Sequence, residues 1–107
     1  MPTRKEFAQY LQDQLSLAGN IRCRPLMGEY GLWCDGIFFG TIENDCLYLK
    51  ITPAARHLLP DAPVEEPHPG AKFLAVRETD DREFLARLVC ETCAELPPPK
   101  PRRKQIP

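Results

Sequence analysis

The sequence has no long hydrophobic run. No stretch approaches the roughly 18 apolar residues that a transmembrane helix needs. The first ten residues, MPTRKEFAQY, lack the apolar centre of a signal peptide. We therefore expect no contact with a membrane and predict a cytoplasmic protein whose thiols are reduced.

Catalytic signatures are also scarce. The two histidines, His57 and His68, stand alone, and there is no Gly-x-Ser-x-Gly motif. The glycine-rich GEYG segment leads into a predicted strand and lacks the Lys-Ser/Thr end of a phosphate-binding loop. Turn geometry alone accounts for Asp35 and Asp45. We predict that the protein is not an enzyme, and we assign it no catalytic residue and no cofactor.

Net charge is low, at −1, but it is unevenly distributed along the 107 residues. All 15 acidic residues precede residue 96, and they give residues 1–96 a net charge of −5. Such a body repels nucleic-acid phosphates. We predict one domain over residues 1–96 and a disordered Pro-rich tail over 97–107, whose cations are the weak nucleic-acid candidates: Lys100, Arg102, Arg103 and Lys104.

The centre of the chain carries the clearest secondary-structure signal. The segment EYGLWCDGIFFGTIENDCLYLKI contains three β-rich runs separated by Asp35-Gly36 and Asn44-Asp45. Asp-Gly between apolar runs is a strong signal for a two-residue hairpin turn, and Asn-Asp is a weaker one. Two such turns place Cys34 opposite Ile37, and Glu43 opposite Cys46.

This register predicts the two faces of the sheet. One face is wholly apolar and is expected to be the core: Trp33, Phe38, Ile42, Leu47, Leu49 and Ile51. The other face carries an apolar and aromatic cluster that is large for an exposed surface. Its members are the candidate partner-binding residues: Tyr30, Leu32, Ile37, Phe39 and Tyr48. The alternative is that a helix or the 60–70 segment of the same chain covers this face.

Helices are expected on both sides of this region. Thr3 and Glu6 fit a capping box for a first helix that stops at Gly19. Thr52-Pro53 begins a short helix that ends before Pro60, residues 60–70 are expected to be a loop, and KFLAV forms one more strand. A last helix, capped by Asp80, covers about residues 81–96. The predicted fold is α+β, with an antiparallel meander and N-terminal, short middle and C-terminal helices.

The Cys-x-x-Cys at Cys90 and Cys93 is a weak candidate for a metal or redox site. Helical spacing places Cys90 opposite the buried stripe and Cys93 on its flank, so both are expected to be exposed or half exposed. Both lie near the C-terminal end of the helix, where the dipole disfavours a thiolate. A structural zinc site needs four ligands, and no second Cys-x-x-Cys is present. Two thiols without function remain the favoured interpretation.

The run LMGEYGLWCDGIFF at residues 26–39, with LYLK at 47–50, resembles the TfoX (Sxy) N-terminal domain family. Element order and length are similar from about residue 4 to 96. The resemblance implies a secretion-chaperone-like α+β fold and a link to bacterial regulators of competence and transcription. We expect a stand-alone N-terminal domain, without the C-terminal domain that the best-known members carry. The resemblance supplies no catalytic residues.

Three hypotheses of function follow from these observations. The first is a non-enzymatic interaction or regulatory module that binds a protein partner through the apolar cluster, with a second copy of itself as one candidate partner. The second is weak nucleic-acid binding by the basic tail. The third is a thiol or metal sensor that uses Cys90 and Cys93.

Overall fold

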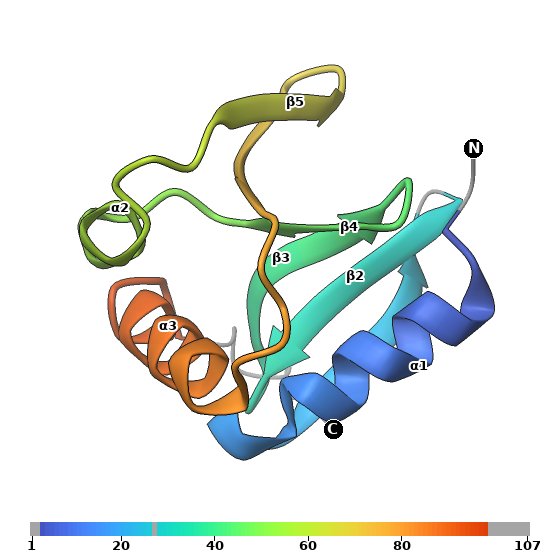
Figure 1. The fold of residues 1–107 in the computed structure, drawn as a ribbon. Helices are drawn as coiled ribbons and strands as arrows, with labels where there is room; N and C mark the ends of the chain where they lie inside the picture. Colours follow the sequence, from blue (N-terminus) through green and yellow to red (C-terminus); the bar gives the residue numbers. More distant parts are fainter. Residues whose placement is uncertain (1–2, 27, 99–107) are drawn as a thin grey trace, which may run out of the picture.

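The computed structural model describes residues 3–26 and 28–98 (Figure 1). The α+β class predicted from the sequence is confirmed. The elements in chain order are α1 (Lys5–Gln14), the 3-10 turn η1 (Ser16–Ala18), β1 (Ile21–Leu26), β2 (Glu29–Cys34), β3 (Ile37–Glu43), β4 (Cys46–Leu49), α2 (Pro53–Leu58), β5 (Val64–His68), β6 (Ala71–Val76) and α3 (Arg82–Ala94). No helix within the described residues is long and apolar enough to cross a membrane.

The strands form one antiparallel sheet in the order β1-β2-β3-β4-β6-β5. Both predicted hairpin turns are confirmed. Asp35 and Gly36 have φ of 50° and 87°, and Asn44 and Asp45 have φ of 53° and 56°. These positive values are what two-residue hairpins require. Cys34 lies opposite Ile37, and Glu43 opposite Cys46, as the turns predict.

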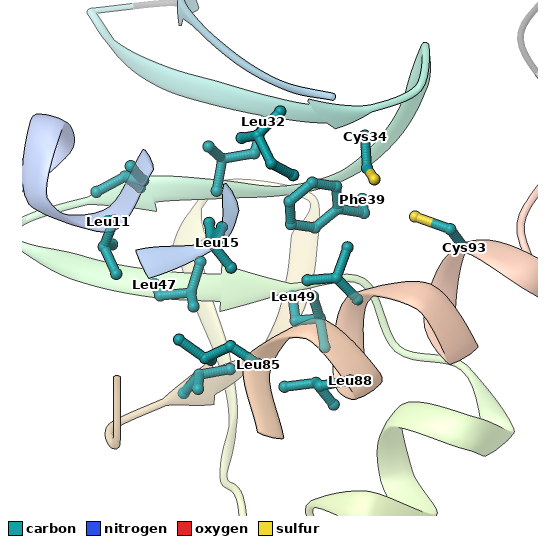
Figure 2. Packing of buried hydrophobic residues seen from close by; sticks show 14 of the residues in the cluster. Leu11, Leu15, Leu32, Cys34, Phe39, Leu47, Leu49, Leu85, Leu88 and Cys93 are labelled. Atoms are coloured by element: carbon teal, nitrogen blue, oxygen red, sulfur yellow. The ribbon is translucent and has the colours of Figure 1, made fainter. Parts of the chain in front are cut away.

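The main core lies between the sheet and two helices. Figure 1 shows α1 and α3 on the same side of β2 and β3. Fully buried leucines of α1, β4 and α3 meet around Phe39, as Figure 2 shows. The short helix α2 begins as predicted, with the Thr52 side chain accepting a hydrogen bond from the Ala55 N–H and Pro53 in the first turn. Its N–H at Ala54 also donates to Glu95 Oε1 at 2.7 Å.

A β-bulge in β3 places two of the six predicted core residues, Trp33 and Phe38, on the wrong face. Trp33 pairs with Phe38 and Leu32 pairs with Gly40, so Phe39 is an extra residue in the ladder. A bulge shifts the alternation of side chains by one residue. Phe39 is therefore fully buried on the helix side together with Ile42, whereas Phe38 and Trp33 are only partly buried.

Of the six predicted core residues, three lie in the main core and three lie outside it. Ile42, Leu47 and Leu49 are buried in the main core, as predicted. Trp33 and Phe38 lie on the opposite face. Ile51 is also outside the core, with 44% of its surface exposed, because it lies beyond the end of β4.

Three local predictions are also wrong. Thr3 does not cap α1. Its backbone N–H instead donates to Glu29 Oε1 at 2.9 Å, and its hydroxyl accepts from the Asp45 N–H. The cap of α3 is Asp81 rather than Asp80, with Oδ1 accepting from the Phe84 N–H at 3.0 Å. The 60–70 segment contains β5, which Pro67 permits because β5 is an edge strand.

Candidate functional site

The candidate site lies on the sheet face opposite α1 and α3. There β1, β2, β3 and the residue after β4 present cationic and aromatic side chains that no helix of the described residues covers. We call this group the outer strip. It consists of Arg22, Arg24, Trp33, Phe38 and Lys50.

Aromatic contacts give the outer strip a defined geometry. The rings of Trp33 and Phe38 form a cross-strand pair with centroids 5.2 Å apart and planes at 51°. Lys50 Nζ lies 5.0 Å from the centre of the Phe38 ring, a cation–π contact. A Cβ atom on Gly31 would lie 2.7 Å from the Trp33 ring, so this glycine makes room for the indole to lie along β2.

Two arginines complete the outer strip at the edge of the sheet. Arg22 lies opposite Trp33, and Arg24 lies opposite Gly31, with both arginine side chains exposed. A shallow hollow of about 280 Å³ is lined by Arg22, Arg24, Trp33 and Gly36. The nearest carboxylate along the chain, Asp35, accepts a hydrogen bond from the Asn20 N–H at 3.0 Å. The outer strip therefore combines flat apolar surface with positive charge.

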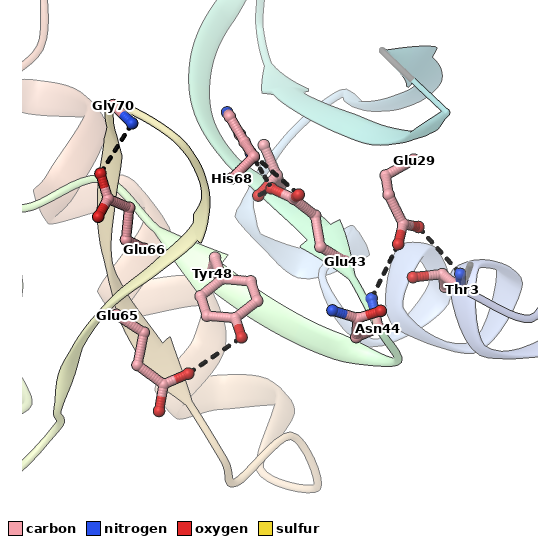
Figure 3. A network of polar contacts seen from close by, with 10 residues as sticks. Thr3, Glu29, Glu43, Asn44, Tyr48, Glu65, Glu66, His68 and Gly70 are labelled. Carbon is pink, nitrogen blue, oxygen red and sulfur yellow. Dashed lines mark hydrogen bonds and ion pairs between the residues drawn. The ribbon is translucent and has the colours of Figure 1, made fainter. Parts of the chain in front are cut away.

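The remainder of this face is closed by the chain itself. Side chains of β4 and β6 form a second small core of Tyr48, Phe73 and Ala75. His68 Nδ1 lies 3.0 Å from both carboxylate oxygens of Glu43, although β4 and β6 separate their strands in the sheet order. Strands about 4.8 Å apart in a flat sheet would not allow this contact. The β5–β6 end therefore curls over the face, and Figure 3 shows the resulting contact between His68 and Glu43.

Polar contacts hold this closed region together. Glu43 is buried and also accepts a hydrogen bond from Thr41 Oγ1 at 2.8 Å. The Tyr48 hydroxyl donates to Glu65 Oε1 at 3.0 Å. Burial, with this hydrogen bond, raises the pKa of Tyr48 to about 12. The phenol of Tyr48 is therefore a neutral hydrogen-bond donor at physiological pH.

The predicted docking cluster does not form an exposed patch. Leu32 and Phe39 are 0% exposed and belong to the main core. Tyr48 lies in the second small core, and Tyr30 and Ile37 are half-buried against the main core. The prediction of one contiguous exposed cluster is wrong because the bulge turns Phe39 inward and the β5–β6 hairpin covers Tyr48.

The thiols of Cys90 and Cys93 have different environments. Cys90 is exposed, as predicted, but Cys93 is only 8% exposed and lies in the main core. The expectation that Cys93 would be exposed or half exposed is therefore wrong. Figure 2 shows the Cys93 and Cys34 sulfurs pointing toward one another. Burial raises the pKa of Cys34 to about 11 and that of Cys93 to about 12, which keeps both protonated at neutral pH.

The two remaining sequence candidates are a metal site and the cationic tail. Within residues 3–26 and 28–98, no group of three or more His, Cys, Asp or Glu side chains is arranged to hold a metal ion. The four tail cations proposed for nucleic-acid contact lie outside the described residues: Lys100, Arg102, Arg103 and Lys104.

Comparison with protein families identifies a match to most of the chain. The model of the family described as TfoX N-terminal domain matches residues 13–95. The chain belongs to this family. No curated protein matches the sequence. In this TfoX N-terminal domain the match includes all five residues of the outer strip, together with Cys34, Cys90 and Cys93.

Sequence reasoning missed the outer strip of this TfoX N-terminal domain. It placed Trp33 and Phe38 in the core and assigned no role to Arg22 or Arg24. One signal was available, because an isolated glycine inside a strand pattern, here Gly40, is typical of a bulge. A bulge next to Gly40 would predict that Phe39 faces the core and Phe38 faces the opposite side of the sheet, as observed.

Proposed function

We propose that this TfoX N-terminal domain is a non-enzymatic, cytoplasmic interaction module with a regulatory role, and that it binds its partner through the outer strip. The occupant is a short, extended, acidic segment of another protein. The observation that carries the proposal is the tilted Trp33–Phe38 ring pair, bordered by Arg22, Arg24 and Lys50 on a sheet face that the described helices leave uncovered.

Charge complementarity supports an acidic partner. The three cations of the outer strip come from two places, Arg22 and Arg24 from β1 and Lys50 from just after β4, so positive charge borders the aromatic pair on both sides. Aromatic and arginine side chains are enriched at protein interfaces, where they provide most of the binding energy. The net charge of −5 over residues 1–96 opposes a long polyanion. A short acidic peptide meets less of this repulsion than nucleic acid does.

The position of β1 supports an extended partner. Among the described strands β1 forms one edge of the sheet, and an edge strand presents unpaired backbone groups. Gln12 Nε2 donates to the Ile21 carbonyl at 3.5 Å, which occupies one group near the start of β1. A peptide that adds to this edge as a strand directs alternate side chains toward Arg22 and Arg24. Pro25 lacks an N–H and limits the pairing to the first part of β1.

The carboxylates near the outer strip have structural roles, which supports a binding role over catalysis. Glu29 accepts hydrogen bonds from the Thr3 and Asn44 N–H groups at 2.9 and 3.0 Å and thereby joins the N-terminus to the second hairpin turn. Figure 3 shows these two contacts. Asp35 likewise joins the first hairpin turn to the segment before β1, because its Oδ1 accepts a hydrogen bond from the Asn20 N–H.

Selection from a displayed random peptide library tests the proposal. We expect enrichment of sequences in which Asp or Glu alternates with apolar residues. Binding of a selected peptide should fall roughly tenfold or more in the double variant Arg22→Glu, Arg24→Glu, because charge reversal turns attraction into repulsion. The matched control is Lys72→Glu, which reverses an exposed strand cation away from the outer strip and should leave affinity unchanged.

Three results would contradict this function. The first is no enrichment of acidic peptides. The second is equal binding by the double variant. The third is tight binding of a thymidine oligonucleotide that the double variant loses, which would assign the outer strip to single-stranded nucleic acid. Sedimentation of the same proteins would show whether the occupant is a second copy of the chain.

A further inference from the structure

Three cysteines from two distant parts of the chain meet at one place. Cys34 ends β2, and Cys90 and Cys93 lie in the last two turns of α3. Cys34 Sγ lies 3.7 Å from the Ala18 carbonyl oxygen, and Cys90 Sγ lies 3.3 Å from the same oxygen. The Cys93 sulfur points toward the Cys34 sulfur, as Figure 2 shows. We call these three residues the thiol cluster.

Exposure differs among the members of the thiol cluster. Cys90 is exposed, whereas Cys34 and Cys93 are 3% and 8% exposed. A small solvent-borne oxidant therefore meets Cys90 first. Reactive cysteines are partly exposed, while deeply buried ones are inert until a neighbour brings the reaction to them. Cys90 is that neighbour for Cys34, because both sulfurs contact the Ala18 carbonyl oxygen.

We propose that the thiol cluster is a peroxide-oxidisable site in which Cys90 is oxidised first and a Cys34–Cys90 disulfide is the product. The Cys90 sulfur attacks one oxygen of hydrogen peroxide. An S–O bond forms, the O–O bond breaks, and one water leaves after protonation, which gives a sulfenic acid. The Cys34 sulfur then attacks the Cys90 sulfur. An S–S bond forms, the S–O bond breaks, and the departing hydroxide takes the Cys34 proton and leaves as the second water.

The geometry favours Cys34 over Cys93 as the second thiol. A Cys90–Cys93 bridge would join two positions of one continuous helix, whereas Cys34 approaches α3 from a separate strand. The product would fasten the Asp35-Gly36 hairpin to the C-terminal helix. It would also constrain Gly19, where an added Cβ would lie 3.1 Å from Cys34 Sγ.

Peptide mapping of the full chain tests this site. The reduced protein is treated with a small excess of hydrogen peroxide near neutral pH, and free thiols are blocked before digestion without reductant. We expect a linked pair of peptides that contain Cys34 and Cys90. A dimedone adduct, which marks sulfenic acid, should occur at Cys90 when Cys34 is replaced by alanine.

Matched variants separate this mechanism from general oxidation. In Cys90→Ser, Cys34 and Cys93 should stay reduced at the same peroxide dose. Cys46→Ser, which removes a half-buried thiol near Arg77, should not change the Cys34–Cys90 yield. Mapping of the wild type needs no variant to fold. It therefore still tests for the Cys34–Cys90 disulfide if Cys34→Ala is unstable.

Several results would overturn the proposal. They are sulfinic or sulfonic acid at Cys90 without a bridge, a bridge that joins Cys90 to Cys93, and a Cys34–Cys93 bridge that forms equally well in Cys90→Ser. Zinc bound at the thiol cluster in native mass spectrometry, with protection from peroxide, would also overturn it in favour of a metal site.

Discussion

Replacement of Phe39 by alanine is expected to lower the free energy of unfolding by about 3–5 kcal/mol, the usual range for a buried phenylalanine. Phe39 is 0% exposed and lies between leucines of the sheet and of the helices. The same change at Phe38 removes only a half-buried ring that contacts Trp33 and Lys50. We expect it to cost about 1 kcal/mol.

Urea unfolding of the two variants measures this difference. The pair is well matched, because the residues are adjacent, of the same type and in the same strand. If Phe39→Ala leaves too little folded protein, Phe39→Leu keeps most of the volume and should still cost more than Phe38→Leu. A greater loss at Phe38 than at Phe39 would contradict the bulge and restore the regular alternation that the hairpin turns alone imply.

Replacement of Gly40 by alanine is expected to be the second most damaging change. A Cβ atom at this position would lie 2.1 Å from the Tyr48 carbonyl oxygen and 3.3 Å from the Leu49 Cα. Both are backbone atoms of β4, so no side-chain rotation relieves the contact. Overpacking of a core costs about 1–3 kcal/mol and sometimes more, and we expect a loss at or above the upper end of this range.

Thermal unfolding of Gly40→Ala measures the effect, and Gly70→Ala is a suitable control. Gly70 has φ of 83° but no atom within 4 Å of an added Cβ, so its replacement costs only backbone strain. We expect the lower melting temperature in Gly40→Ala. Equal stability of this variant and the wild type would mean that β3 and β4 do not approach one another as closely as the structure shows.

Much of the fold follows from local sequence signals. The turns at Asp35-Gly36 and Asn44-Asp45 need positive φ, and these residue types tolerate it, so the register next to each turn is predictable. Thr52-Pro53 predicts the start of α2 for a similarly local reason. These signals depend only on neighbouring residues, which is why the strands and helices are largely where the sequence places them.

The bulge is less predictable from the sequence. Consecutive residues of a strand point to opposite faces of the sheet, and here the residues for both faces are apolar. Phe38 and Phe39 are adjacent and identical, so hydrophobicity does not show which one faces the core. The structure adds a constraint that the sequence does not show, because Gly40 lies close to the backbone of β4. That contact exists only in the folded sheet. As a consequence of the bulge, the outer strip occupies the uncovered face of the sheet, where the sequence predicted the binding cluster.

The other missed features depend on long-range packing. Two prolines and two glutamates in residues 63–67 conceal β5, because they are unfavourable in a central strand but permitted at an edge. Helical spacing correctly places Cys90 in solvent. It cannot predict that Cys34, more than fifty residues earlier, will lie against the same helix.

Quenching of tryptophan fluorescence is the most direct test of the central claim, that the bulge turns Trp33 outward beside a cluster of cations. Trp33 is the only tryptophan in the 107 residues, so the whole signal belongs to the outer strip. We predict that iodide quenches the native protein clearly more than caesium does, because Arg22, Arg24 and Lys50 attract the anion. The difference should shrink in the double variant Arg22→Glu, Arg24→Glu. Little quenching by either ion would place Trp33 inside the core and contradict the account.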